Sequence, residues 1–498
     1  MLAQAIDILT GTPMSFFWMV LGVIVGIVFG AIPGLSATMA IAIFLPVTYG
    51  LSPVEGMACL LGLFVGGISG GLISAILLNM PGTPSSVATC FDGRPLALKG
   101  MADKALGAGI VFSFLGTLFG VAALIFIAPP LASVAIKFGP HEYFAVTFFS
   151  MSLIITLASD SLCKGLMAGL LGMAFGMVGL DAIEASPRFW FEIRSVRSGF
   201  NILTVLIGLY AVAEVLNNCE NASDTADAKV DDVVMRGFGV TVKEIWSQMG
   251  NCIRSSFIGM AIGILPGIGG GTSNIVAYTV AKNQSKHPEK FGKGELAGVV
   301  APESANNAGI GGAIIPLLTL GIPGDTTTAM LLGGLMIHGI TPGPLIFENF
   351  GGLVYAIYIL LLLASFTMLI AEFFGLKWFI KVLKVPKYYL LPVIIVLCGV
   401  GAFGLNNRIF DVGSVLFFGL IGYALAKCKY PLPPMILGFI LGPVLEVSLR
   451  RGLTSSQGDF TEFLTRPISG SIIVFTLLFI AFSLYKVFRA QKRATFVE

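Results

Sequence analysis

Four proline–glycine pairs interrupt apolar segments of this chain, and polar side chains follow each pair. They are Pro33-Gly34, Pro81-Gly82, Pro266-Gly267 and Pro323-Gly324. Proline removes a backbone donor and clashes with the preceding helical turn, while glycine lets the chain unwind. In hydrocarbon the freed N–H and C=O groups need partners, so such breaks persist where they face protein, water or a ligand. The four pairs therefore predict broken helices around a binding site.

The polar residues after each break are suited to begin a new helix, because Ser, Thr, Asn and Asp side chains cap helix N-termini. A helix N-terminus carries free N–H groups and about half a positive charge, which makes it an anion site. Four converging termini could hold a carboxylate without a buried lysine or arginine. The alternative is ordinary proline kinks, capped by hydroxyls, in a packed bundle. The predicted substrate-binding residues are Pro33, Gly34, Ser36, Thr38, Asn79, Pro81, Gly82, Thr83, Ser85, Pro266, Gly267, Gly270, Thr272, Ser273, Pro323, Gly324, Thr326 and Thr327.

Acid and amide side chains near the third and fourth breaks form a second candidate site. A charge near the bilayer midplane costs at least ~3 kcal/mol unless it is compensated. Oxygen ligands suit Na⁺, and a carboxylate can also carry H⁺. The predicted ion-coupling residues are Glu303, Asn306, Asn307 and Asp325. Alternatively, Glu303 lies at the membrane interface in a salt bridge with the lysines between 282 and 293.

No other metal site is expected beyond a possible Na⁺. The three histidines have no partner at helical spacing, and the seven cysteines show no CxxC spacing. The glycine-rich run 267–271 lacks the Lys-Ser/Thr of a phosphate-binding loop, so no nucleotide and no ATPase module are expected. No nucleophile–base pair stands out at membrane depth, so we expect no enzymatic activity and no cofactor.

The elements that must position these residues are membrane helices. The chain has 498 residues, of which 56% are hydrophobic and 11% charged, whereas about 25% are charged in soluble domains. Apolar runs recur often enough for roughly eleven to thirteen crossings of about 30 Å of hydrocarbon. The first run lacks the features of a signal peptide, so we expect it to be retained. The formal net charge of +3 favours no nucleic-acid partner.

The breaks belong to two copies of one pattern. The first break recurs after 233 residues and the second after 242, which predicts a repeat with the site at its interface. The link between the two breaks has no basic residue in the first copy (46–55) but four lysines in the second (282–293). The link after the second break reverses this bias. Since basic loops face the cytoplasm, opposite bias predicts opposite orientation, that is, an inverted repeat.

These observations predict an all-α polytopic membrane protein made of two inverted-topology repeats with broken or re-entrant helices. The basic tail after the last span places the C-terminus in the cytoplasm. The predicted divisions are a first repeat at 1–216 with motifs at 30–38 and 75–95, a hydrophilic cytoplasmic linker at 217–249, a second repeat at 250–448 with motifs at 263–274 and 301–344, and a loop, final span and basic tail at 449–498.

Nearly end to end, the chain resembles the large membrane subunit of the bacterial tripartite tricarboxylate transporters, the TctA-type proteins. The resemblance rests on Gly30–Thr38, Ala75–Pro84, Phe91–Pro95, Arg188-Phe189 with Phe191, Ala301–Asn307, Pro316–Gly324, and Ile337–Gly339 with Pro342–Pro344. It implies a complex with a small four-helix membrane subunit and a soluble periplasmic solute-binding protein that delivers the carboxylate, with uptake driven by Na⁺.

The predicted function is therefore that of a permease subunit in the bacterial inner membrane. It would import tricarboxylates or related carboxylates with a Na⁺ or H⁺ gradient, without an ATPase. The alternative is an uncoupled anion channel that uses the same helix N-termini.

Overall fold

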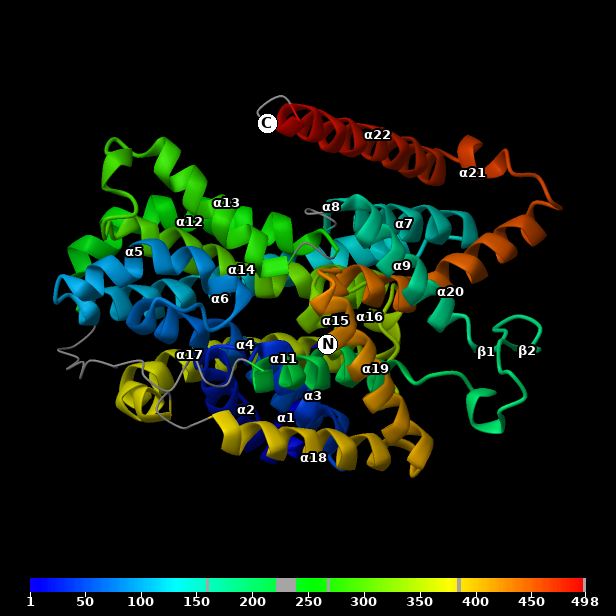
Figure 1. Ribbon diagram of the computed structural model, residues 1–498, viewed down its shortest axis with the longest axis horizontal. Helices are drawn as coiled ribbons and strands as arrows, with labels where there is room; N and C mark the ends of the chain where they lie inside the picture. The colour runs from blue at the N-terminus through cyan, green and yellow to red at the C-terminus, as the bar shows by residue number, and fades with distance from the viewer. Residues whose placement is uncertain (158–160, 221–238, 267–268, 383–386, 496–498) are drawn as a thin grey trace. The chain divides into compact units, whose positions relative to one another are not determined.

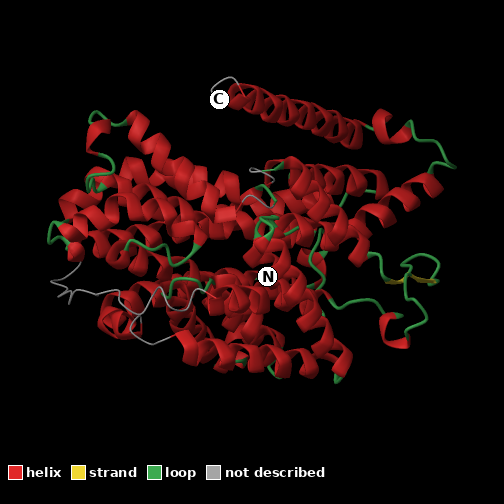
Figure 2. Cartoon of the chain, in the orientation of Figure 1, coloured by secondary structure: helices red, strands yellow, loops and turns green. Residues whose placement is uncertain are grey.

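The computed structural model describes residues 1–157, 161–220, 239–266, 269–382 and 387–495. Most of them are helical (Figure 2). Within these ranges the strands are β1 (Gly179–Leu180) and β2 (Pro187–Arg188), which pair antiparallel. The prediction of an all-α polytopic membrane protein is confirmed.

Eight helical segments in the described ranges are long and apolar enough to cross a membrane. They are α2 (Met14–Ala31), α4 (Pro53–Leu78), α6 (Ala102–Ala135), 202–220 (α10 to α11), α17 (Gly351–Val382), α19 (Ile409–Lys427), α20 (Leu432–Ser455) and α22 (Pro467–Thr495). Five shorter apolar helices include α3 (Ala37–Thr48) and α15 (Thr326–Ile337), with 12 residues each. Twelve residues rise about 18 Å, so these two helices are of about half-span length.

The remaining helices and turns are shorter or more polar than these eight segments. They are α1 (Leu2–Gly11), η1 (Pro84–Ser86), α5 (Val87–Leu98), α7 (Pro140–Ser152), α8 (Ile154–Leu157), α9 (Leu162–Gly176), η2 (Arg194–Val196), α12 (Val242–Ile264), α13 (Gly269–Gln284), η5 (Pro288–Lys290), α14 (Ala297–Leu320), α16 (Ile346–Asn349), α18 (Lys387–Asn406) and α21 (Glu462–Thr465).

The order of elements around the breaks is the same in both halves of the chain. In the first half α2, α3, α4, α5 and α6 follow one another, and in the second α12, α13, α14, α15 and α17. The first break begins at Ile32 and the third at Leu265, and both residues have φ −80° and ψ 116°. The second begins at Asn79 and the fourth at Gly321, and both are left-handed. The halves thus repeat in architecture as well as in sequence, while their orientation in a membrane stays a prediction.

Contacts divide the chain into two compact units, and each unit takes one segment from each half. Unit 1 contains Met1–Ser133 and Tyr210–Arg408, and unit 2 contains Val134–Leu209 and Ile409–Glu498. Unit 1 includes all four breaks (Figure 1). The predicted boundaries of the two repeats and the linker describe the duplicated sequence. The division into two contact units does not test them.

Close helix packing in unit 1 depends on glycine. A Cβ on Gly26 of α2 would lie 2.6 Å from the Leu63 carbonyl oxygen of α4, and one on Gly263 of α12 would lie 2.7 Å from the Gly309 carbonyl oxygen of α14. Small residues let membrane helices approach to backbone contact. The two helices of each pair therefore hold the start of each break rigidly.

In unit 2, an ion-pair network closes the β1–β2 hairpin onto α20. The Asp181 carboxylate accepts from the backbone N–H groups of Ile183 and Glu184 at 2.7 and 2.8 Å, and from Arg450 at 2.6 Å. These backbone amides, together with Arg450, lower the pKa of Asp181 to about 2. Arg188 of β2 joins the network by donating to Glu446 at 2.7 Å.

Candidate functional site

The structure brings the four breaks together as two crosswise pairs. The Thr38 hydroxyl at the start of α3 lies 2.8 Å from that of Thr327 at the start of α15. The Asn274 amide of α13 donates to the Ser85 carbonyl of η1. The first break therefore contacts the fourth, and the second contacts the third.

The two crosswise contacts correspond to each other under the repeat. The 233-residue offset carries Thr38 to Gly271, and the 242-residue offset carries Ser85 to Thr327. A Cβ on Gly271 would lie 3.4 Å from the carbonyl oxygen of Pro84, next to Ser85. An exchange of equivalent partners is what a two-fold relation between the repeats requires.

Within each copy, the two breaks also touch. A Cβ on Gly82 would overlap the Gly30 carbonyl oxygen, and one on Gly324 would lie 2.5 Å from the Gly263 carbonyl oxygen. Gly30 and Gly263 are again 233 residues apart, and Gly82 and Gly324 are 242 apart. Each break thus contacts two others. We call this closed arrangement the ring of breaks.

Several residues predicted to bind the substrate or the coupling ion also shape the local backbone. The Ser36 side chain accepts from Met39 N–H at 3.2 Å and caps α3. The carboxylate of Asp325 accepts from the Thr328 backbone N–H at 2.7 Å in a capping box at the start of α15. Gly34 has φ +86°, and its carbonyl accepts from the Asn218 side chain at 2.8 Å. Caps of this kind satisfy one or two of the free N–H groups at a helix start and leave the others for a ligand.

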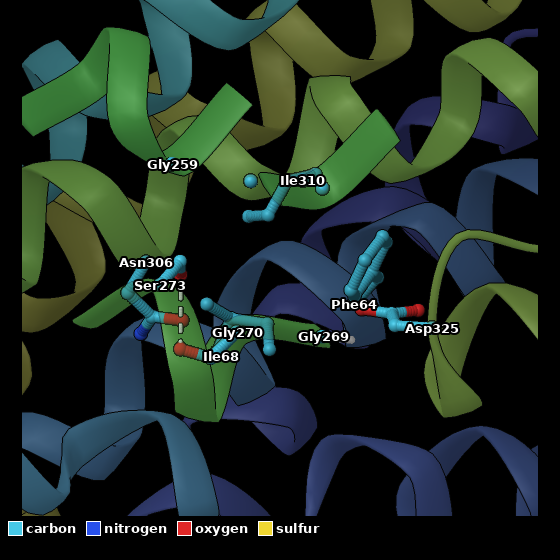
Figure 3. Close-up of a pocket in the computed structure, with 11 residues that line it drawn as sticks. Phe64, Ile68, Gly259, Gly269, Gly270, Ser273, Asn306, Ile310 and Asp325 are labelled. Atoms are coloured by element: carbon cyan, nitrogen blue, oxygen red, sulfur yellow. Dashed lines mark hydrogen bonds between the residues drawn. The ribbon is translucent and has the colours of Figure 1, made fainter. Parts of the chain in front are cut away.

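A small pocket lies against the ring. It is lined by Phe64, Ile68, Gly259, Gly263, Gly269, Gly270, Ser273, Asn306, Gly309, Ile310 and Asp325. Figure 3 draws Asn306 and Ser273 on one side of the pocket and Phe64 and Asp325 on the other. Its free space is comparable to one water molecule. This conformation is therefore closed to a tricarboxylate.

Asn306 is the pocket residue best placed to bind a ligand. Its side chain is 2% exposed, and neither its amide nitrogen nor its amide oxygen has a hydrogen-bond partner among the described residues. A Cβ on Gly270 would lie 2.8 Å from the amide oxygen, which shows how closely α13 approaches it. By contrast, the Ser273 hydroxyl donates to the Gly270 carbonyl at 2.9 Å. Buried polar groups are normally satisfied, so the free Asn306 amide indicates a ligand position.

Of the predicted site residues, the pocket lining contains Gly270, Ser273, Asn306 and Asp325. Gly267 lies outside the described residues. Glu303 and Asn307 lie within α14, and the others belong to the breaks but not to the lining. The sequence prediction missed the apolar wall of Phe64, Ile68 and Ile310 and the close-packed Gly259 and Gly309, because apolar residues in an apolar span carry no distinguishing signal.

Glu303 is buried and hydrogen-bonded to hydroxyl groups. Its carboxyl oxygens accept from Thr89 at 2.5 Å and from Ser113 at 2.9 Å. The neighbouring Asn307 donates to the Glu303 carbonyl at 3.0 Å. The alternative of a salt bridge to the lysines between 282 and 293 is wrong, because Glu303 is 0% exposed and these hydroxyls occupy both of its oxygens.

Asp92, in contrast, has a structural role that the sequence did not reveal. One of its oxygens accepts from the backbone N–H groups of Gly292, Gly294 and Glu295 at 2.7–2.9 Å, and the other accepts from the Tyr278 hydroxyl at 2.9 Å. A carboxylate with this many donors is stable without a cation. Asp92 therefore fastens α5 of the first copy to the link before α14 of the second.

The polar side chains of the pocket are the Asn306 amide, the Ser273 hydroxyl and the Asp325 carboxylate. Among the described residues, no three His, Cys, Asp or Glu side chains lie close enough together to hold a metal ion. Amides, hydroxyls and helix N-termini are groups that can replace the hydration shell of an anion.

Comparison with known proteins identifies the family. The family model described as "Tripartite tricarboxylate transporter TctA family" matches residues 16–437. The chain is 35% identical over 487 residues to an Agrobacterium vitis protein described as "Uncharacterized 52.8 kDa protein in TAR-I ttuC' 3'region", covering 98% of this chain and 96% of that protein. It is 37% identical over 240 residues to a second protein of that organism, described as "Uncharacterized protein in TAR-II ttuC' 3'region", covering 48% of this chain and 99% of that protein. No solved structure matches the chain. The protein therefore belongs to the tripartite tricarboxylate transporter TctA family.

Proposed function

We propose that the chain is the permease subunit of a binding-protein-dependent secondary transporter that imports tricarboxylates or related carboxylates. The observation that carries this proposal is the free Asn306 amide in a pocket bounded by the ring of breaks. Neutral donors and helix N-termini suit a carboxylate. The bacterial inner membrane is the proposed location, with the C-terminus in the cytoplasm.

The proposed partners follow from family membership. A tripartite system has two further components, which we take to be a small four-helix membrane subunit and a periplasmic solute-binding protein. Selection of the carboxylate would take place largely in that soluble protein. The site in this chain would then need to recognise mainly the carboxylate group of the substrate. Neutral dipoles can do this.

Energy for uptake is proposed to come from a Na⁺ or H⁺ gradient. Asp325 lines the pocket, and Glu303 lies three residues before Asn306 on α14. Unwound backbone at the breaks offers carbonyl oxygens, which coordinate Na⁺ in broken-helix transporters. Glu303, Asn306, Asn307 and Asp325 remain the proposed coupling residues, with Asn306 able to contact the substrate as well.

The test is uptake of labelled citrate and related carboxylates into proteoliposomes that contain both membrane subunits, with the binding protein outside. The wild type should accumulate substrate only when an ion gradient is imposed. Asn306→Ala should raise the half-saturating concentration by about ten- to hundredfold, because a hydrogen bond to a charged group contributes about 1.5–3 kcal/mol. Ser304→Ala is the matched control, since Ser304 is buried on the same helix but outside the pocket lining.

Two results would count against the proposal. If flux is the same with and without any gradient and never exceeds equilibrium, the chain is an anion channel. If Asn306→Ala and Ser304→Ala transport equally well, the pocket is not the substrate site.

A further inference from the structure

A buried acid outside the predicted site, Glu372 of α17, has an unusual environment. Its side chain is 0% exposed, and one carboxyl oxygen accepts from the Ser69 hydroxyl of α4 at 2.9 Å. Within the part of the chain that the structure describes, the other oxygen has no hydrogen-bond partner. Its neighbours one turn away on either side, Met368 and Leu376, are buried and apolar. An acid placed among such neighbours in a candidate membrane span is a functional hypothesis by default.

Among the described residues, Glu372 has no ion-pair partner. Helices α1, α2, α4 and α16 pack against α17 and contain no lysine or arginine. Helix α6 touches α17 through Phe114 and Phe366, and its Lys104 is paired with Glu244. Lys377 and Lys381 of α17 itself are exposed. The other titratable groups on these neighbouring helices are Asp7 of α1, Glu55 and Cys59 of α4, Asp103 of α6 and Glu348 of α16. None of them supplies a positive charge to Glu372, so its negative charge would be uncompensated there.

A purely structural acid would have both oxygens occupied, as the other buried acids of this unit do. Asp92 accepts four hydrogen bonds, and Glu303 accepts one on each oxygen. Glu372 leaves one oxygen free. A free oxygen can carry a proton that is added or removed without breaking any other contact.

Glu372 is linked to the pocket wall through the residues next to it. Its partner Ser69 follows Ile68, which lines the pocket from α4. The other buried glutamate of this unit, Glu303, lies one helical turn from Asn306, which lines the pocket from α14. Each acid is therefore connected to a pocket-lining residue by one short step along a helix.

The backbone around Glu372 favours a proton over Na⁺ as the ligand. Sodium sites in broken-helix transporters use carbonyl oxygens of unwound backbone. Glu372 and Ser69 both lie within continuous helices, in which the neighbouring carbonyls accept intrahelical bonds. One carboxyl oxygen and one hydroxyl are too few ligands for a metal cation, whereas a proton needs a single oxygen.

We propose that Glu372, held by Ser69, binds a proton and releases it in each transport cycle. The reaction is carboxylate plus H⁺ giving the carboxylic acid, with the proton taken from one side of the membrane and released to the other. The inference rests on the proposed function, since it assigns one coupling ion of that function to one residue. An anion in the pocket would repel an ionised Glu372 and would therefore favour the protonated form of Glu372.

The experiment uses proteoliposomes of both membrane subunits with the binding protein, without Na⁺ and with the membrane potential clamped. An imposed gradient of about one pH unit should drive about tenfold accumulation of a labelled tricarboxylate for each proton coupled. Exchange of labelled for unlabelled substrate across the vesicle membrane is measured in parallel. In Glu372→Gln, accumulation should fall to the equilibrium level while exchange continues. Glu372→Asp, which keeps the titratable group, should retain part of the accumulation.

A second measurement needs no variant. A hydrophobic carbodiimide reacts with protonated carboxyls in apolar surroundings, so mass spectrometry of the wild-type complex should find its adduct at Glu372, more strongly at low pH. Accumulation by Glu372→Gln at the wild-type level, or labelling of other acids but not Glu372, would overturn the inference. A wild type that shows neither accumulation nor exchange refutes the proposed function instead.

Discussion

Addition of one methyl group to Gly324 tests whether the ring of breaks depends on direct backbone contact. The new Cβ would lie 2.5 Å from the Gly263 carbonyl oxygen and 2.6 Å from the Ala313 Cα, whereas ordinary contacts are 3.4–4 Å. The fourth break would have to move about 1 Å from α12 and α14. Both opposing atoms belong to the backbone, so no side-chain rotation relieves the overlap. Overpacking costs about 1–3 kcal/mol, and we expect Gly324→Ala to reach about 3 kcal/mol.

The repeat supplies a second measurement, and the chain a control. Gly82→Ala should behave like Gly324→Ala, because its Cβ would overlap the equivalent carbonyl of Gly30 and lie 2.9 Å from the Gly71 Cα. Neither glycine has positive φ, so strain does not add to the steric effect. Gly50→Ala is the control, since a Cβ there meets no atom within 4 Å.

The assay is thermal unfolding of the purified membrane complex in detergent, followed by uptake in proteoliposomes. Gly82→Ala and Gly324→Ala should unfold at clearly lower temperature than Gly50→Ala and should transport poorly. If all three variants match the wild type in both assays, the breaks are loosely packed and the reasoning is refuted.

Three further predictions concern orientation, coupling and pH. With single cysteines on a Cys-free background, positions near Pro53 should label from the periplasm and positions near Lys286 from the cytoplasm; labelling from one side would exclude an inverted repeat. Glu303→Gln or Asp325→Asn should raise the Na⁺ concentration for half-maximal uptake or abolish Na⁺ dependence, whereas unchanged dependence would make both acids structural. The pKa of Asp181 is lowered to about 2 in the folded state. Ionised Asp181 therefore stabilises the folded state fully above about pH 4, and this contribution is lost as the pH falls toward 2. The melting temperatures of wild type and Asp181→Asn should therefore converge over that interval, and a constant difference would contradict it.

The repeated breaks could be predicted from the sequence because proline and glycine act locally. The repeat offsets could also be read from the sequence. The structure shows the same offsets, because Gly82 meets Gly30 as Gly324 meets Gly263. The crosswise pairing of Thr38 with Thr327 was not predictable, since it depends on packing between segments 289 residues apart.

Other parts of the site were missed for different reasons. Asp325 was predicted as an ion ligand, although a capping acid followed three residues later by Thr328 is also a recognisable helix start. Glu372 was overlooked because a lone acid in an apolar span has no neighbouring motif. Its importance depends on which of its oxygens are hydrogen-bonded, and only the three-dimensional structure shows this.

The ring of breaks also has an energetic consequence. Its two crosswise joints are equivalent in architecture but differ in chemistry, since one is a hydroxyl pair at Thr38 and Thr327 and the other an amide–carbonyl bond at Asn274 and Ser85. A transport cycle that parts one joint while the other holds would alternate between two forms of related architecture. Residue differences between the copies would then set the relative populations of the two forms. Substitutions at the joints should therefore shift these populations rather than abolish one of the forms.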